Sequence, residues 1–216
     1  MKGQIIEAIE KNKIIAIIRG LDKQNCVRTA EALYHGGIKL VEVTFNQKET
    51  QKVGQTLDAI RAIRQTLDKR VWVGAGTVTS PELARLAKEA GAAFIISPDA
   101  NADVIRVTGE LGMVSIPGAL TATEVLAAHR AGADFVKLFP AASLGTGYLK
   151  ALRSPINHVK FLAVGGIDQS NLKDFLQAGA YGLGVGGCLV KQQWIEEGNF
   201  QGITELAKEF CRAAEI

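Results

Sequence analysis

A repeated pattern constrains the fold of this chain more than any other feature of its sequence. A stretch with helical spacing ends in a turn of small residues, and a short apolar run follows, at intervals of roughly 20–25 residues as in βα units. The turns are His35-Gly36-Gly37, Ala90-Gly91-Ala92, Leu111-Gly112, Ala131-Gly132-Ala133 and Ala178-Gly179-Ala180. Glycine after a helix adopts the left-handed conformation of a C-terminal cap at little cost. The pattern therefore predicts alternating helices and strands.

Eight apolar runs are candidate strands. They cover residues 14–18, 39–45, 71–75, 93–97, 113–116, 134–139, 159–164 and 181–185. Each is almost continuously apolar, as expected for strands with helices on one face and a packed barrel interior on the other. We expect one α/β domain over residues 1–216, a single (β/α)8 TIM barrel with a short N-terminal helix around Ile5, Ile6 and Ile9. An open doubly wound sheet is the alternative, but no G-x-G-x-x-G follows the first strand.

Composition and charge exclude several functional classes. The chain has 47% hydrophobic and 22% charged residues and a net charge of +3, with basic and acidic residues interspersed. Because no basic block or aromatic-basic ladder is present, we expect no nucleic-acid partner. The mild positive balance suits a small anionic substrate instead.

The cysteines and the hydrophobic runs predict the compartment. Cys26, Cys188 and Cys211 are widely separated, with no C-x-x-C pair and no Cys/His cluster of metal-ligand spacing. We therefore expect reduced thiols, a cytoplasmic protein and no metal site. Residues 1–13 carry charges that a signal peptide would not, and the uncharged run 175–190 contains five glycines, which makes it a poor membrane span.

Two ionisable residues interrupt the apolar runs. Lys137 lies within residues 133–140 and Glu42 within residues 41–46. A buried ammonium must be paired, reach water or lose its proton, and a lysine without its proton is a nucleophile. The alternative for each residue is an ion pair at the barrel rim. Because a barrel gathers the carboxyl ends of its strands, Lys137 and Glu42 could reach one substrate, and Arg19 at the end of the first run could bind its carboxylate.

Paired glycines end the last two candidate strands. Gly165-Gly166 and Gly186-Gly187 occupy the loops that often bind phosphate in barrels. Glycine lets backbone N–H groups approach an anion closely, and a helix N-terminus adds its dipole. The alternative is that both pairs only form tight turns.

Seven stretches give the chain a resemblance to a known family over nearly its full length. They are Val41-Glu42-Val43-Thr44, Gly74-Ala75-Gly76-Thr77-Val78, Ile96-Ser97-Pro98, Ile116-Pro117-Gly118, Val136-Lys137-Leu138-Phe139-Pro140, Gly165-Gly166-Ile167 and Gly184-Val185-Gly186-Gly187. The chain resembles the bacterial 2-keto-3-deoxy-6-phosphogluconate (KDPG) and 4-hydroxy-2-oxoglutarate (KHG) aldolases. The resemblance implies a class I aldolase, a lyase, on a (β/α)8 barrel that forms a homotrimer and uses no metal or cofactor.

The resemblance also implies roles for individual residues. Lys137 would form the Schiff base and Glu42 would be the general acid/base. The remaining substrate-binding positions would be Arg19, Thr77, Pro98, Asn46 and Phe139. The phosphate-binding positions would be Gly165, Gly166, Gly186, Gly187 and Cys188. The implied reaction is reversible cleavage of KDPG to pyruvate and D-glyceraldehyde 3-phosphate, with cleavage of KHG to pyruvate and glyoxylate as a second activity.

The chain departs from the gluconate members at three positions. They often carry arginine where Asn46 stands, threonine at Val164 and serine at Cys188. Asn46 and the run Ala163-Val164-Gly165-Gly166 look more like the sister 2-keto-3-deoxy-6-phosphogalactonate aldolases, which differ in the C4 epimer that they cleave. Two alternatives come from other classes: a sugar-phosphate isomerase or epimerase, and a sugar-phosphate binding protein without catalytic activity.

Overall fold

The computed structural model describes residues 2–48, 50–68 and 70–215, and a parallel β-sheet forms its centre. The strands are β1 (Ile14–Ile18), β2 (Leu40–Thr44), β3 (Trp72–Gly76), β4 (Phe94–Ile96), β5 (Val114–Ile116), β6 (Gly118–Ala119), β7 (Val136–Leu138), β8 (Phe161–Val164) and β9 (Gly182–Val185). All eight predicted strands are present, each shorter than or equal to its apolar run. The ninth, β6, continues β5 after Pro117, which cannot donate a ladder hydrogen bond.

The order of the strands closes the sheet into a barrel. The order is β5-β4-β3-β2-β1-β9-β8-β7-β6, and every recorded pair is parallel. Because β5 and β6 are consecutive in the chain but lie at opposite ends of this order, the segment 114–119 joins the two edges. The backbone N–H of Asp134 also donates to Ser115 O at 3.0 Å across the junction. The predicted (β/α)8 barrel is confirmed, and the open doubly wound sheet is wrong.

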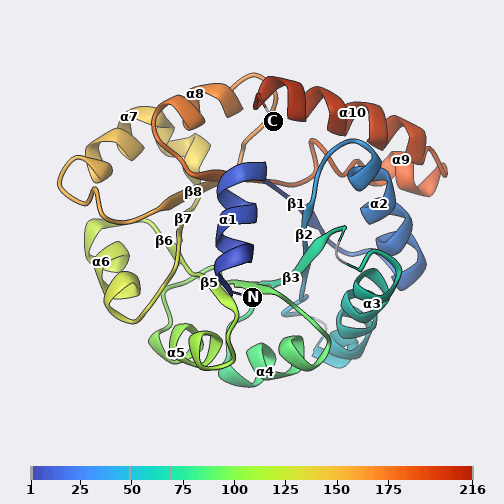
Figure 1. Cartoon of the computed structure of the whole chain (residues 1–216), viewed down its shortest axis with the longest axis horizontal. Helices are drawn as coiled ribbons and strands as arrows, with labels where there is room; N and C mark the ends of the chain where they lie inside the picture. The colour runs from blue at the N-terminus through green and yellow to red at the C-terminus, as the bar shows by residue number, and fades with distance from the viewer. Residues whose placement is uncertain (1, 49, 69, 216) are drawn as a thin grey trace.

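The helices are α1 (Lys2–Asn12), α2 (Lys23–His35), the short 3-10 helix η1 (Thr50–Lys52), α3 (Val53–Thr66), α4 (Pro81–Glu89), α5 (Ala102–Glu110), α6 (Ala122–Arg130), α7 (Ala141–Arg153), α8 (Leu172–Gln177), α9 (Gln192–Glu196) and α10 (Phe200–Ala213). Helices α2 to α10 form a ring outside the strands (Figure 1). Among the helices of the described residues, none is long and apolar enough to cross a membrane.

The local signals in the sequence have the expected structures. The predicted glycine turns all contain a glycine with positive φ, at positions 37, 91, 112, 132 and 179. Ser80 caps α4 ahead of Pro81, and Thr121 forms a capping box with Glu124. The last helix, α10, begins at Phe200, and the Asn199 side chain caps it by accepting from the Gly202 N–H.

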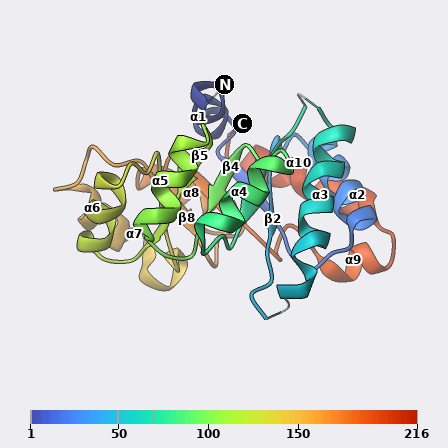
Figure 2. The same cartoon turned by 90° about the horizontal axis from the view of Figure 1, so that it is seen from below.

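Side chains that point into the barrel form one hydrophobic cluster. It combines Ile5 and Ile9 of α1 with strand residues such as Ile15, Leu40 and Phe94. Helix α1 leads directly into β1, so it covers the barrel at the amino ends of the strands. Figure 1 shows it lying across the centre of the ring, and in Figure 2 it projects from one end of the barrel. That end is therefore plugged, and the opposite end is left for a ligand.

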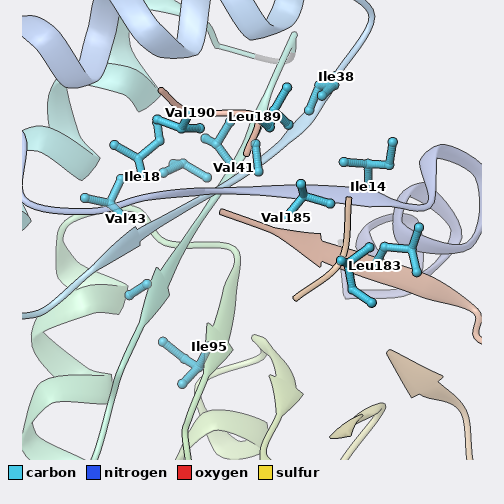
Figure 3. Close-up of a cluster of buried hydrophobic side chains, with 14 of the residues drawn as sticks. Ile14, Ile18, Ile38, Val41, Val43, Ile95, Leu183, Val185, Leu189 and Val190 are labelled. Carbon is cyan, nitrogen blue, oxygen red and sulfur yellow. The ribbon is translucent and has the colours of Figure 1, made fainter. Parts of the chain in front are cut away.

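A second cluster packs between the strands and the surrounding helices. It includes outward-pointing residues of β1, β2 and β9 (Figure 3). Alternate residues of a strand point to opposite faces. In β2, Val41 and Val43 join this outer cluster, whereas Leu40 points inward and belongs to the interior cluster. Glu42 lies two residues after Leu40 and therefore points to the same face of the strand, so its carboxylate is directed into the barrel.

Candidate active site

A pocket of about 950 Å³ lies at the carboxyl ends of the strands, where barrels place their active sites. Every predicted site residue except Asn46 lines this pocket. They are Arg19, Glu42, Thr77, Pro98, Lys137, Phe139, Gly165, Gly166, Gly186, Gly187 and Cys188. They come from seven strand ends or the loops that follow them, and the barrel brings them together from positions far apart in the chain.

Asn46 is placed elsewhere. It lies exposed in the loop after β2, and its side-chain oxygen accepts a hydrogen bond from the Lys48 backbone N–H at 3.0 Å. It is not among the residues that line the pocket in the described part of the chain. That Asn46 belongs to the substrate site therefore stays a prediction.

Glu42 is buried inside the barrel with only 3% of its surface exposed. Its neighbours in the strand register are Ile17 on β1 and Gly74 on β3. Gly76, two residues further along β3, leaves the space that the carboxylate fills, since a Cβ on Gly76 would overlap Glu42 Oε1. Burial raises the pKa of Glu42 to about 6, against the opposing effects of the Lys137 and Arg19 charges.

Lys137 is the central residue of β7 and enters the same pocket. Its backbone N–H donates to Pro117 O at 2.8 Å, and β6 and β8 flank it through Gly118 and Leu162. Burial lowers the pKa of Lys137, the Glu42 charge partly opposes this shift, and the Arg19 charge lowers the pKa further. The Lys137 Nζ atom lies 4.8 Å from the centre of the Phe139 ring.

The electrostatic coupling of these groups is suited to proton transfer. Desolvation moves the pKa of the lysine down and that of the carboxyl group up, so both approach neutrality. No hydrogen bond or ion pair joins the side chains of Lys137 and Glu42 in the described structure, and both line the same pocket. An amine without its proton is a nucleophile, and a carboxylate in the same pocket can serve as its acid/base partner.

The other part of the pocket is formed by the glycine pairs. Gly165 and Gly166 have φ of +94° and +73°, which favours glycine at both positions. The Asn171 side chain donates to Gly166 O at 2.8 Å and holds this loop. The Cys188 thiol donates to Ile167 O at 3.0 Å and thereby links the loop after β9 to the loop after β8. A Cβ on Gly186 or Gly187 would meet no atom within 4 Å, so these residues border open space.

Sequence reasoning missed Asp168, which also lines this part of the pocket. Its carboxylate accepts from the Ser170 N–H at 2.8 Å and from the Ser170 hydroxyl at 2.6 Å. These hydrogen bonds lower the pKa of Asp168, so it is ionised at neutral pH. Its position three residues after Gly165, in a loop expected to bind phosphate, was the available signal. In the described structure, only Arg19 and Lys137 bring positive charge to the pocket lining, and both act on Glu42.

Within the described residues, no group of three His, Cys, Asp or Glu side chains could hold a metal ion. None of the three histidines lines the pocket in the described structure, and His35 and His129 are in the last turns of α2 and α6. His129 and His158 stack edge to face, with ring centres 4.8 Å apart.

Comparison with known proteins adds a family assignment. A family model described as "KDPG and KHG aldolase" matches residues 5–206. A curated protein from Treponema pallidum, 2-dehydro-3-deoxy-phosphogluconate aldolase, is 37% identical over 207 residues, which cover 95% of each chain. The 2-dehydro-3-deoxy-6-phosphogalactonate aldolase of Escherichia coli is 31% identical over 206 residues, covering 95% of this chain and 98% of that protein.

A solved structure shares both the fold and the sequence pattern. It is the KDPG aldolase of Legionella pneumophila, with pyruvate captured at low pH as a covalent carbinolamine intermediate. The TM-score is 0.84 with 28% identity, and the match covers 96% of this chain and 97% of that chain.

Proposed function

The chain belongs to the KDPG and KHG aldolase family, whose members are lyases, and from this premise we propose that Lys137 forms the Schiff base and Glu42 moves the protons. One observation carries the proposal. A lysine with a lowered pKa and a carboxyl group with a pKa of about 6 line one pocket together with an arginine. The carbinolamine in the Legionella pneumophila relative supports covalent chemistry with pyruvate at this site.

The reaction can be written for the groups in the pocket. The neutral Lys137 amine attacks the C2 carbonyl of the keto acid, and loss of water gives an iminium ion. Glu42, as carboxylate, takes the proton of the C4 hydroxyl while the C3–C4 bond breaks. The bonding electrons move to the iminium nitrogen and leave an enamine of pyruvate, and the aldehyde departs. Protonation of the enamine at C3 by the Glu42 carboxyl group and hydrolysis of the resulting iminium release pyruvate and restore Lys137.

Arg19 and Thr77 would hold the keto acid during this sequence. A guanidinium binds a carboxylate through two parallel hydrogen bonds, and both residues line the pocket with Glu42 and Lys137. Pro98 and the Phe139 ring would add apolar contacts to the pyruvate portion. The substrate carboxylate would be neutralised by Arg19, so that Glu42 stays available for proton transfer.

Gly165, Gly166, Gly186 and Gly187 would bind the phosphate at the far end of the substrate. All four glycines line the pocket, Gly186 and Gly187 border open space, and N–H groups of such loops bind anions without side chains. Cys188 would hold the two loops in register through its bond to Ile167 O. For KHG, which has no phosphate, we expect this end to contribute little.

Cleavage of the galactonate epimer is a second candidate activity. It is favoured by Val164, which lines the pocket and fills the space beside Gly184, and by the relative from Escherichia coli. Measuring kcat/KM for the two C4 epimers at equal enzyme concentration decides between the gluconate and galactonate activities. A preference of more than about tenfold, or 1.4 kcal/mol, for either epimer identifies the physiological substrate class.

Reductive trapping tests the central proposal. Pyruvate plus borohydride should add one pyruvate-derived group to the wild-type protein, and peptide mapping should place it on Lys137. Lys137→Met should abolish trapping and lower turnover by on the order of 10⁴–10⁶-fold, as for other lost nucleophiles. Lys160→Met is the matched control, since Lys160 pairs with Glu10 away from the pocket. An adduct on another lysine, or trapping in Lys137→Met, contradicts the assignment.

We also propose that the protein is a cytoplasmic homotrimer of a single domain. The resemblance to the family supports the trimer, and the three free cysteines support a reducing compartment. Light scattering coupled to gel filtration tests the trimer directly, and a monomeric or dimeric mass would contradict it.

A further inference from the structure

Thr77 has a backbone conformation that its type of residue rarely adopts. Its φ is +58°, and β-branched residues are strongly disfavoured in the left-handed region. Lys13 and Glu215, the other two described non-glycine residues with positive φ, follow helices α1 and α10, where this conformation ends a helix. Thr77 instead follows strand β3 and lines the pocket. Such strain persists only where the surrounding structure enforces it.

The side chain of Gln47, which follows β2, makes two hydrogen bonds to the turn that contains the strained Thr77. The Gln47 amide Nε2 donates to Thr77 O at 2.8 Å, and its Oε1 accepts from the Thr79 hydroxyl at 3.2 Å. Gln47 thus holds the peptide that follows Thr77 and the residue two positions later. It is exposed and does not line the pocket, so it does not touch a ligand itself.

A second side chain holds the same turn from the β4 side. The Ser97 hydroxyl, in a residue only 3% exposed, donates to Val78 O at 2.7 Å. The Val78 N–H also donates to Ile96 O at 3.2 Å. The carbonyl groups of Thr77 and Val78 are therefore fixed by side chains that follow β2 and β4, the two strands that flank β3. Contacts from both sides of β3 therefore hold the turn that contains Thr77.

We propose that Gln47 and Ser97 are positioning residues that clamp Thr77 in its left-handed conformation, so that Thr77 is presented to the keto-acid end of the substrate. The inference rests on the proposed function, because it deepens the role of Thr77 in binding the pyruvate portion. Without the clamp, the turn after β3 relaxes toward a right-handed or extended conformation and Thr77 no longer lines the pocket in this way. Affinity for the keto acid then falls while Lys137 and Glu42 remain intact.

The test measures the pyruvate concentration that half-saturates borohydride trapping, read by intact mass, beside the melting temperature. Gln47→Ala should raise this concentration about 3–10-fold, the range expected for losing a hydrogen bond in a folded protein, at a melting temperature close to that of the wild type. Gln65→Ala is the matched control, because Gln65 is an exposed glutamine on α3 outside the pocket, and it should change neither value. A lower melting temperature with unchanged half-saturation overturns the inference.

A double-mutant cycle separates the clamp from a general effect. If Gln47 acts through Thr77, adding Gln47→Ala to Thr77→Ala should change half-saturation no further than Thr77→Ala does alone, and the same should hold for Ser97→Ala. Additive losses overturn the inference. Absence of trapping in the wild type contradicts the Schiff-base function itself, whereas normal wild-type trapping with an unchanged half-saturation in Gln47→Ala overturns only the clamp.

Discussion

At one end of the pocket, Lys137, Glu42 and Arg19 present charged side chains from the strands, whereas at the other end the loops after β8 and β9 present glycine backbone. Glu42 is almost fully buried, and its pKa is raised. Gly166 and Gly187 are exposed, and Asp168, which lines the same part of the pocket, is negative. The charged end is built to change the protonation of its groups. The glycine end is built to let a ligand approach closely.

This contrast predicts that substitutions at the two ends of the pocket have different kinetic effects. Changes at the charged end should act on kcat, because they alter groups that take part in bond breaking. Changes at the glycine end should act on KM for phosphorylated substrates, because they alter contacts that are the same in ground and transition states.

Glu42→Gln should lower turnover by about 10²–10⁴-fold, the usual contribution of a general acid/base group. Glutamine has nearly the same volume, so the fold and reductive trapping of pyruvate at Lys137 should persist. Exchange of the pyruvate methyl protons into heavy water, followed by NMR, should collapse together with cleavage. Glu110→Gln on α5 is the control, since Glu110 is exposed and lies outside the pocket. Near wild-type exchange in Glu42→Gln would assign the proton transfer to another group.

The same substitution should stabilise the protein at neutral pH. The folded-state pKa of Glu42 is raised from 4.5 to about 6, so the folded state binds its proton more tightly than the unfolded state does. The stability that this proton confers is fully present below pH 4.5 and is lost as the pH rises through 6. The unfolding free energy of Glu42→Gln minus that of the wild type should therefore rise by about 2 kcal/mol between pH 4.5 and pH 7. Urea denaturation at the two pH values measures this gain, and a constant difference between the variants would contradict the raised pKa.

The sequence allowed the charged end to be predicted but not all of the glycine end. Lys137 and Glu42 stood out because an ionisable residue inside an apolar run is rare, and the strand ends converge in a barrel. Asn46 was included because it follows the same strand as Glu42; it does not line the pocket in the described structure, and its role in substrate binding stays a prediction. Asp168 was missed because a carboxylate in a turn usually caps that turn, as it also does here. The space beside Gly76 could be recognised only from the structure, since it depends on the register of β2 and β3.

Gly187→Ala should raise KM for the phosphorylated substrate about tenfold, the effect of losing about 1.4 kcal/mol of hydrogen bonding to a charged group. The new methyl group meets no protein atom within 4 Å, and the φ of Gly187 lies outside the left-handed range, so the fold should be unaffected. Proton exchange of pyruvate, which has no phosphate, should stay at the wild-type rate. Gly109→Ala is the control, because it meets no protein atom either and lies on α5. Equal losses for pyruvate and for the phosphorylated substrate would show that the two ends do not act separately.

Asp168→Asn should lower KM for the phosphorylated substrate, by about two- to fivefold, and is the smallest effect that we expect. Asparagine keeps an oxygen that can accept from Ser170, but removes a negative charge beside the phosphate loops. In a solvent-exposed setting two unit charges about 4 Å apart interact by only about 1 kcal/mol, and salt screens the interaction. The difference between Asp168→Asn and wild type should therefore shrink as the salt concentration is raised to about 1 M, where the Debye length is about 3 Å. Kinetics with KHG supply the control, since a substrate without phosphate should respond much less. If the substitution instead raises KM for the phosphorylated substrate, Asp168 contributes to binding through the geometry of its turn, and the glycine end depends on that loop more than on charge.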